Sequence, residues 1–310
     1  MTARTTTAAA QSAPQSLSAL SVGSAPSAVT AIRDQTIGFL GGGHMGRALV
    51  AALRRHDHPA AQIVVGEPGG DARRALERDF GVRTTADNLE VAAAADILVL
   101  AVKPQDMAAA LLPLQVTLAH RRPLVVSIAA GLPVARLQEY CGTALPIVRA
   151  MPNRPALLGL GASGLYAPAD VPAEARARAE AVLAAAGMVA WIDHETLMDA
   201  VTAVSGSGPA YFFRLAEALA DAGRAQGLPT EVASRLAAAT LAGAGAMAAA
   251  DADLAGLRAA VTSRGGTTAA ALATFETGGL ERLVAEAVES ATRRGRELAQ
   301  AASDSTVKRG

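Results

Sequence analysis

The sequence predicts an α/β fold in which an N-terminal, Rossmann-type, doubly wound parallel sheet precedes an all-helical C-terminal domain. Between residues 36 and 192, short runs of branched aliphatic residues alternate with alanine-rich helical stretches, a pattern typical of β-α-β crossover units. A glycine-rich turn follows the first aliphatic run. After Glu195 the strand signals stop, whereas helical stretches continue to about residue 301.

The length, charge and cysteine content of the chain limit its class. Its 310 residues suggest about two domains. The 28 basic and 28 acidic side chains balance, and only 3% of residues are aromatic, so we expect neither nucleic acid nor a membrane surface as a partner. Cys141 is the only cysteine and no Cys/His cluster has zinc-site spacing, so we expect no metal and a reducing, cytoplasmic setting.

We expect two domains with a flexible segment at each end. Residues 1–34, rich in Ala, Ser, Thr and Gln, are interpreted as a flexible extension, and residues 302–310 as a flexible tail. Residues 35–195 form the predicted dinucleotide-binding domain and residues 196–301 the helical one. The apolar stretch near residue 20 is too short for a signal peptide, and we find no window with the roughly 18 uninterrupted apolar residues of a membrane span.

The aliphatic runs and the helical stretches give the expected elements in chain order. The predicted strands are 36–40, 62–65, 96–102, 123–129, 146–149, 161–166 and 188–192. The predicted helices of the first domain follow Gly46, Asp71, Ala86, Pro104, Pro133 and Pro172, several of which suit a first helical turn. Those of the second domain are 209–226, 229–250, 267–276 and 279–301, separated by glycine pairs or Gly-Leu-Pro.

The first predicted strand runs directly into the turn GGGHMG, and an amphipathic helix begins there. Gly41, Gly43 and Gly46 have the G-x-G-x-x-G spacing in a strand–turn–helix context. We expect the first glycine to make the sharp turn, the second to let backbone approach a pyrophosphate, and the third to permit close helix–strand packing. The helix N-terminus offers unpaired N–H groups to the anion, which predicts a dinucleotide-binding site.

The end of the second predicted strand bears on the choice of cofactor. Glu67 lies about 20 residues beyond Gly46, where a carboxylate accepts hydrogen bonds from ribose hydroxyls and repels a 2′-phosphate. It favours NADH, whereas Arg73 and Arg74, one helical turn further on, could clamp a phosphate. All three could equally be solvated surface charges. The sequence therefore leaves NADPH and NADH both open.

Three further segments lie where the nicotinamide half of a dinucleotide would reach. The strands at 96–102 and 123–129 end in small residues, which let backbone approach the ring. Lys103 follows the first of them, and we favour a strand-end cation near pyrophosphate or water over a catalytic lysine. Asn153 follows the next strand and either presents its amide to the nicotinamide or caps the local turn.

Six motifs in chain order resemble those of the pyrroline-5-carboxylate reductases: GGGHMG, AVKP, SIAAG, RAMPN, VSGSGPAY and TSRGGTT. The resemblance runs from about Ile37 to Leu298, and the last two motifs are not general Rossmann features. It implies NAD(P)H-dependent reduction of 1-pyrroline-5-carboxylate to L-proline, the last step of proline biosynthesis. It also implies that the C-terminal domain is a dimerisation domain, that one chain's Rossmann domain and the partner's helices share the substrate site, and that dimers often assemble into decamers.

The resemblance assigns residues to the cofactor and to the substrate. The cofactor positions, together with Gly46, Glu67 and Asn153 above, are Leu40, Gly41, Gly42, Gly43, His44, Met45, Asn88, Ala101, Val102, Lys103, Pro104, Ile128, Ala129 and Ala130. The substrate positions are Glu195, Val261, Ser263, Gly266, Thr267 and Thr268. Within the glycine turn, we expect His44 to be a surface residue near the cofactor rather than an acid.

Two positions depart from the family pattern. Arg154 stands where the family usually has Thr, and Arg264 stands where it usually has Pro. Each replaces a compact neutral residue with a long cation beside the expected cleft, which either strengthens the attraction for an anionic substrate or crowds it.

The turn at 263–268 suggests how a substrate is held. Its successive N–H groups precede a predicted helix and can form a concavity for a carboxylate, although a Gly-rich connection with a Thr N-cap is the plainer alternative. A protonated imine is already electrophilic, so hydride transfer needs positioning more than a strong acid. Thr268 and Ser263 are therefore the catalytic candidates, Thr268 for the ring nitrogen. Ser205, Ser207 and Tyr211 are weaker ones, and 206–209 is expected to make a tight entry to a buried helix.

Other enzyme classes need residues that this chain lacks. The 3-hydroxyacid dehydrogenases use a helix-borne lysine, and a PLP-binding protein needs a Schiff-base lysine. No lysine occurs between Lys103 and Lys308. A reductase of a related cyclic imine and a non-catalytic dinucleotide sensor stay open as alternatives.

Overall fold

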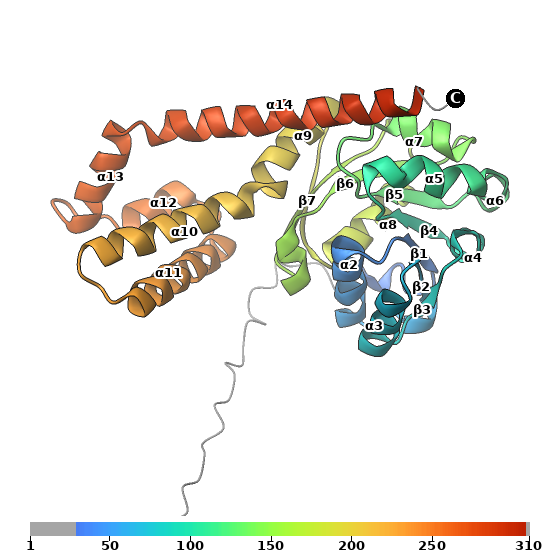
Figure 1. Cartoon of the computed structure of the whole chain (residues 1–310), viewed down its shortest axis with the longest axis horizontal. Helices are drawn as coiled ribbons and strands as arrows, with labels where there is room; N and C mark the ends of the chain where they lie inside the picture. The colour runs from blue at the N-terminus through green and yellow to red at the C-terminus, as the bar shows by residue number, and fades with distance from the viewer. Residues whose placement is uncertain (1–28, 308–310) are drawn as a thin grey trace, which may run out of the picture.

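The computed structural model describes residues 29–307 and has two parts, an α/β domain and an elongated helical unit (Figure 1). The α/β domain is built on one eight-stranded sheet of order β3-β2-β1-β4-β5-β6-β7-β8. The strands are β1 (Ile37–Leu40), β2 (Ile63–Gly66), β3 (Arg83–Thr85), β4 (Ile97–Leu100), β5 (Leu124–Ser127), β6 (Ile147–Met151), β7 (Gly161–Tyr166) and β8 (Gly187–Trp191). β1 to β6 are parallel, β7 pairs antiparallel with β6, and β8 runs parallel to β7. The order reverses between β1 and β4, which is where a doubly wound sheet binds its ligand.

The α/β helices cover both faces of this sheet. They are α2 (His44–Arg55), α3 (Gly70–Phe80), α4 (Asn88–Ala94), α5 (Met107–Leu111), α6 (Gln115–Arg121), α7 (Val134–Cys141) and α8 (Ala173–Ala184). Short 3₁₀ turns connect them: η1 (Ala60–Gln62), η2 (Pro104–Asp106), η3 (Leu112–Leu114), η4 (Arg154–Leu158) and η5 (Glu195–Leu197). The predicted alternation of strands and helices is confirmed.

The central strands are buried on both faces, as continuous aliphatic sequences in parallel sheets require. Alternate residues along β4 enter two different cores. Ile97 and Val99 belong to the core beneath α2 and α8, whereas Leu98 and Leu100 belong to the core beneath α4 to α7. Because side chains on both faces of the strand are buried, every residue of β4 is apolar.

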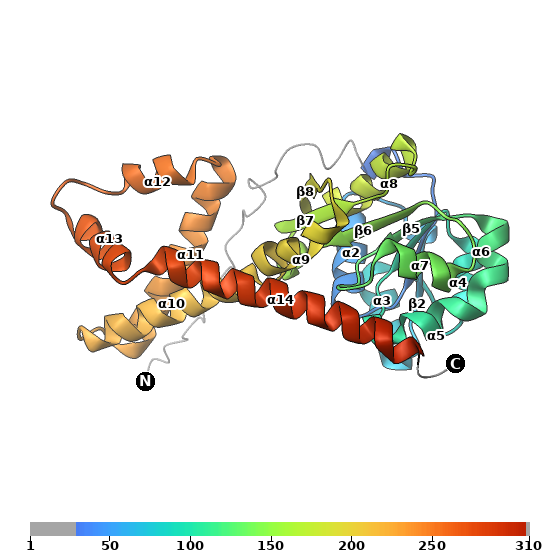
Figure 2. The same cartoon turned by 90° about the horizontal axis from the view of Figure 1, so that it is seen from above.

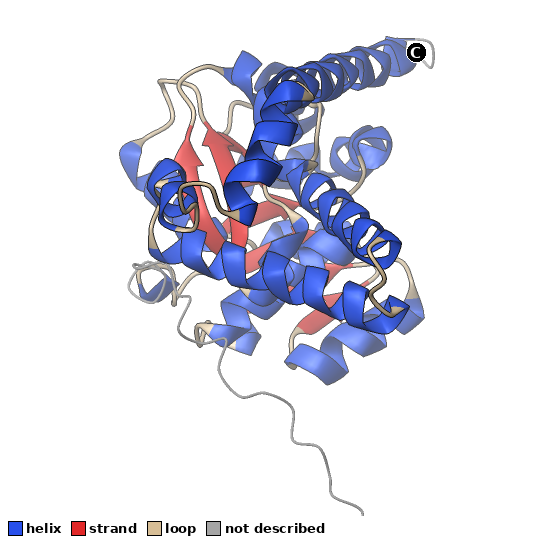
Figure 3. Ribbon diagram, turned by 90° about the vertical axis from the view of Figure 1, so that its left-hand side faces the viewer, coloured by secondary structure: helices blue, strands red, loops and turns tan. Residues whose placement is uncertain are grey.

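The helical unit extends away from the sheet, and Figure 3 shows it end-on with the strands behind it. Its elements are α9 (Met198–Val201), the π-helical turn η6 (Thr202–Gly206), α10 (Gly208–Ala225), α11 (Thr230–Ala250), α12 (Leu254–Ala260), α13 (Thr267–Thr277) and α14 (Leu280–Val307). α10 and α11 form a hairpin, and α14 runs back from α13 towards the α/β domain (Figure 2). α14 passes α9 where a Cβ on Gly295 would lie 3.2 Å from Asp199 Oδ1.

The helical unit leaves large apolar side chains exposed. Phe212 and Phe213 on α10 are 61% and 60% exposed, and Leu236 on α11 and Leu283 on α14 are more than half exposed. The prediction that α10 is a buried helix is therefore wrong within one chain, because α10 has only α11 and η6 beside it. α11 is also long and apolar enough, by length and composition alone, to cross a membrane, although its sequence is interrupted by Glu231, Arg235 and two glycines and so is not the uninterrupted apolar window that we did not find.

The ends of the described chain differ from prediction. Val29 and Ile32 are buried in the core beneath α2 and α8, so the ordered α/β domain begins before residue 35. The predicted flexible extension at 1–28 lies outside the described residues. α14 continues to Val307, through most of the segment predicted as a flexible tail, and residues 308–310 lie outside the description. The strand β3 and the helix α12 were not predicted, since three and seven residues carry too little periodicity.

His58 gives the stability of the α/β domain a pH dependence. Its side chain is fully buried, and neither ring nitrogen has a hydrogen-bond partner among the described residues. Burial lowers the pKa of His58 below its ordinary value of 6.5, because the charged form loses its hydration. The native state therefore holds the neutral ring, while the unfolded chain takes up a proton as the pH falls through 6.5.

We expect the free energy of unfolding to decrease below about pH 6.5 by up to ~1.4 kcal/mol per pH unit, until the native imidazole also titrates. His58→Met should remove this part of the slope, whereas His56→Gln, at a half-buried neighbouring histidine, should keep it. Urea unfolding between about pH 5 and 8 measures the slope. An unchanged slope in His58→Met would contradict the assignment.

Candidate cofactor and substrate site

The glycine turn between β1 and α2 has the geometry of an anion-binding loop. Gly41 has φ +103°, a conformation that side chains rarely adopt, and its N–H donates to Gly66 O at 2.8 Å. A Cβ on Gly46 would lie 2.4 Å from Gly41 O, so this glycine lets α2 approach the turn. Gly43, at the N-cap of α2, has no side-chain cap, and a Cβ added there would meet no atom within 4 Å. Gly41 and Gly46 have the turn and close-packing roles predicted for them, and the open position at Gly43 leaves room for a phosphate at the helix N-terminus, so its predicted contact with pyrophosphate stays a prediction.

Glu67 lies directly after β2 and faces this turn. Its Oε2 accepts the Gly42 N–H at 3.1 Å, and its Oε1 accepts the Gly69 N–H at 3.0 Å. The carboxylate is thus fixed at the rim of the turn by two backbone groups. Glu67 is therefore not simply a solvated surface charge, which was the alternative interpretation from the sequence.

The remaining predicted cofactor residues lie around the same edge of the sheet. Leu40 ends β1 and is buried, whereas His44 is exposed at the start of α2 and Met45 is half-buried. Asn88 begins α4, and its Oδ1 lies over Gly66, where a Cβ would be only 2.5 Å away. The residues that follow β4 and β5, at the same edge, are Ala101, Val102, Lys103, Pro104, Ile128, Ala129 and Ala130. Lys103 and Ala130 are exposed there, and Ala129 is buried. The fold therefore gathers these positions at the carboxyl ends of β1, β2, β4 and β5.

Asn153 is buried and committed to the fold. Its Oδ1 accepts the Ala162 N–H at 2.9 Å, and its Nδ2 donates to Ser205 O at 3.0 Å. These bonds tie the end of β6 to the start of β7 and to the π-helical turn η6. Of the two roles weighed for Asn153, the local structural one has direct support, and contact with the nicotinamide stays a prediction.

The π-helical turn is a feature that the sequence reasoning missed. It contains the first three residues of the motif VSGSGPAY, and the Ser207 N–H donates to Thr202 O at 2.8 Å. Ser205 Oγ donates to Val201 O at 3.0 Å, and a Cβ on Gly206 would lie 2.7 Å from Met151 Cε. π-Helical turns inside longer helices are often found at functional sites. Here one joins the helical unit to the end of β6, and a bend at Ser207 leads from it into α10, where we had predicted a tight entry turn.

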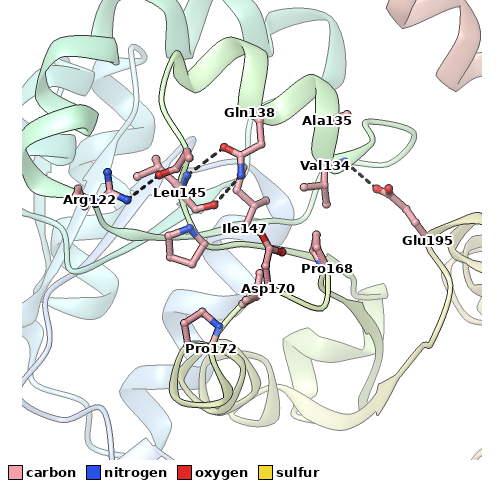
Figure 4. Close-up of a pocket in the computed structure, with 13 residues that line it drawn as sticks. Arg122, Val134, Ala135, Gln138, Leu145, Ile147, Pro168, Asp170, Pro172 and Glu195 are labelled. Atoms are coloured by element: carbon pink, nitrogen blue, oxygen red, sulfur yellow. Dashed lines mark hydrogen bonds between the residues drawn. The ribbon is translucent and has the colours of Figure 1, made fainter.

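Glu195 anchors the junction between the two parts of the molecule. Its Oε1 accepts the Val134 N–H at 2.7 Å (Figure 4), and it also accepts Arg149 Nη1 at 2.7 Å. The Arg149 side chain is only 9% exposed, so the ion pair lies largely out of water. Glu195 also borders a cavity of about 590 Å³ between α7 and the segment that leads into α8, lined mainly by aliphatic and proline side chains. One oxygen of Glu195 is therefore occupied structurally, and its predicted contact with substrate stays a prediction.

The other predicted substrate residues lie on the helical unit. Ser263 and Thr267 are exposed, as is Val261, and Gly266 and Thr268 are half-buried at the start of α13. Gly265 has φ +71°, which favours glycine in this turn, and a Cβ on Gly266 would lie 2.3 Å from Ser263 Oγ, so the two residues are in close contact. α12 and α13 lie at the end of the unit farthest from the sheet in both views (Figures 1 and 2). A single chain does not bring this turn to the glycine turn.

Arg154 and Arg264 are both exposed, the first at the start of η4 after β6 and the second in the turn before α13. Neither guanidinium forms a hydrogen bond or ion pair with another described residue. Both charges are therefore available to an anion. Within residues 29–307, no group of three or more His, Cys, Asp or Glu side chains could hold a metal ion.

Comparison with known proteins gives consistent matches along the chain. The family model described as "Pyrroline-5-carboxylate reductase dimerisation" matches residues 195–298, and the one described as "NADP oxidoreductase coenzyme F420-dependent" matches residues 36–131. Pyrroline-5-carboxylate reductase of Pseudomonas aeruginosa is 47% identical over 265 residues, which are 85% of this chain and 97% of that protein. The pyrroline-5-carboxylate reductase of Vibrio alginolyticus is 43% identical over 269 residues, which are 86% of this chain and 98% of that protein.

Solved structures give the same result. A pyrroline-5-carboxylate reductase from Coxiella burnetii superposes with a TM-score of 0.82 at 37% identity, covering 85% of this chain and 98% of that one. The Plasmodium falciparum pyrroline carboxylate reductase, crystallised with NADP bound, gives a TM-score of 0.73 at 29% identity over 86% of this chain and 99% of that one.

A substitution at Gly43 should affect cofactor binding without affecting folding, because the position is open. Gly43→Ala places a methyl group where the structure has no neighbour, and φ −65° suits alanine, so the melting temperature should stay within a few degrees of wild type. The same methyl group would meet a bound pyrophosphate, and we expect the affinity for reduced nicotinamide cofactor to fall by at least about tenfold. Fluorescence titration measures the affinity. Gly46→Ala is the contrasting variant, because its methyl group meets Gly41 O and should lower the melting temperature; equal effects of both variants on stability would refute the assignment.

Proposed function

The chain belongs to the pyrroline-5-carboxylate reductase family, and from this premise we propose that it reduces 1-pyrroline-5-carboxylate to L-proline with NADH or NADPH, the last step of proline biosynthesis. The observation that carries the proposal is the glycine turn with its open Gly43 position, because free space at the N-terminus of α2 suits a dinucleotide pyrophosphate. When bound, the reduced nicotinamide supplies a hydride to the imine carbon.

The residues of the chain position the substrate rather than activate it. The protonated imine already carries the proton that stays on the product nitrogen, so no strong general acid is needed. The turn 263–268 precedes α13, whose first N–H groups have no intrahelical acceptors and can hold the substrate carboxylate. Ser263 adds a hydroxyl that fixes the face of the ring, and the Thr268 hydroxyl hydrogen-bonds the ring nitrogen.

A second copy of the chain completes the site. The turn 263–268 lies far from the glycine turn of its own chain, and the helical unit exposes apolar side chains along α10, α11 and α14. A homodimer through these helices would cover that surface and bring one chain's turn to its partner's sheet edge. The apolar face of α11 then meets protein rather than a membrane. We also propose further assembly into a decamer, and a cytoplasmic location where the cofactor pool is available.

A steady-state assay tests the activity. Oxidation of NADH or NADPH by the purified chain, followed by absorbance after addition of 1-pyrroline-5-carboxylate, should show turnover with proline as product. Cofactor binding without oxidation would contradict the proposal and favour a non-catalytic dinucleotide sensor.

We expect Thr268→Ala to lower kcat by roughly tenfold to a hundredfold, the loss of one hydrogen bond to a charged group, with little change in cofactor affinity. Thr274→Ala is the matched control, because that hydroxyl, on the same helix, bonds only to Ala270 O. Kinetics and cofactor titration of both variants give the comparison. Wild-type kcat in Thr268→Ala would remove the assigned role.

Phe212→Asp should prevent dimer formation, because it places a charge within the apolar surface that the second chain is expected to cover. The variant should sediment as a monomer at micromolar concentration and lose its activity. Val116→Asp, at an apolar side chain on α6 that is 73% exposed, should leave the assembly unchanged. A fully active monomeric Phe212→Asp chain would show that one copy is sufficient.

A further inference from the structure

We infer that the cofactor site selects NADH over NADPH and that the Glu67 carboxylate decides the selection. The inference rests on the proposed reductase function, whose cofactor is otherwise NADH or NADPH alike. It concerns the end of the site that holds the adenosine ribose, about which the family membership alone says nothing, since cofactor choice is set by single residues at this strand end.

The position of Glu67 is that of a ribose-facing residue. It follows β2, the strand next to β1, and its carboxylate points back to the turn that would hold the pyrophosphate. The Gly42 and Gly69 N–H groups bind different oxygens of the carboxylate, at 3.1 Å and 3.0 Å. Two anchors of this kind fix the plane of the group before any ligand arrives.

The fixed carboxylate suits hydroxyl groups and not a phosphate. A carboxylate oxygen accepts up to about two hydrogen bonds, and each oxygen of Glu67 uses one for the backbone. The second acceptor sites remain for the 2′- and 3′-hydroxyls of NADH, which are donors. A 2′-phosphate carries only acceptor oxygens and a charge of about −2 at neutral pH, so it would meet like charge at this point.

The neighbouring cations do not offset this repulsion. Arg73 Nη1 donates to both Glu67 O and Pro68 O, each at 2.8 Å, which holds this guanidinium against the backbone that follows β2. Arg74 forms an ion pair with Asp71. Although that pair is exposed and weak, it brings a second carboxylate to the first turn of α3. Arg73 and Arg74 therefore both have partners within the protein, and neither side chain is positioned by these contacts to bind a 2′-phosphate.

The test compares the two cofactors on the full-length chain. Wild type should show kcat/KM for NADH at least about tenfold above that for NADPH. In fluorescence titration without substrate, it should likewise bind NADH with the lower Kd. Glu67→Ser should shift both ratios at least about tenfold towards NADPH, since it removes the negative charge that would face the 2′-phosphate. Glu77→Gln, at an exposed carboxylate on α3 that binds only Thr84 Oγ1, should leave both ratios unchanged.

Glu67→Gln is the second variant: it removes the charge and keeps one acceptor oxygen for one of the two backbone N–H groups, whereas its amide NH₂ cannot accept the other. It should shift the ratios in the same direction as Glu67→Ser. Wild-type preference for NADPH, or ratios that do not move in either folded variant, would overturn the inference. Because the Kd ratio is measured without substrate, a chain that binds NADH tightly but does not reduce the imine would refute the proposed function and leave the cofactor selection standing.

Discussion

The structure depends on a helical unit that cannot bury its own apolar surface. α10 and α11 pack against each other, yet side chains as large as Phe212 and Phe213 remain mostly exposed, and α13 sits at the far end with little beside it except α14. An exposed apolar surface of this extent has to be covered, and the description of the matching family model, dimerisation, names the kind of contact that covers it. The same constraint explains the separation of the two candidate half-sites: the turn 263–268 is carried by the unit that faces outward.

The α/β domain, in contrast, is complete in one chain, and its cofactor end is prepared in advance. Gly41 and Gly46 fix the turn by backbone geometry, while Gly43 is left open. Glu67 then joins the turn to the end of β2 through two N–H groups. The junction to the helical unit is fixed by a second carboxylate, Glu195, which holds Arg149 and the N-terminus of α7. Rigid anchoring at both ends suits a reaction in which positioning supplies most of the rate.

Much of this was predictable from the sequence, because periodicity and glycine spacing are local properties. The strand at 161–166 matches β7 residue for residue, and Gly41 and Gly46 have the predicted turn and close-packing roles. What could not be predicted depends on contacts between distant residues. Asn153 and Glu195 look like ligand-binding side chains in the sequence, yet both have partners 46 to 61 residues away that only the fold supplies. The π-helical turn at Thr202–Gly206 carries no local signal, and the burial of Val29 and Ile32 needed the core beneath α2 and α8 to be known.

The central claim is that the cofactor half of the site comes from one chain and the substrate half from another, and mixed dimers test it most directly. Gly43→Val disables only the cofactor half, and Thr268→Ala weakens only the substrate half. Co-expressed in equal amounts, the two variants form mixed dimers in which one of the two sites combines both intact halves. The mixture should then recover about a quarter of wild-type activity, well above either variant alone. If each chain formed its site by itself, no mixture would exceed the average of the two variants, and the claim would be wrong.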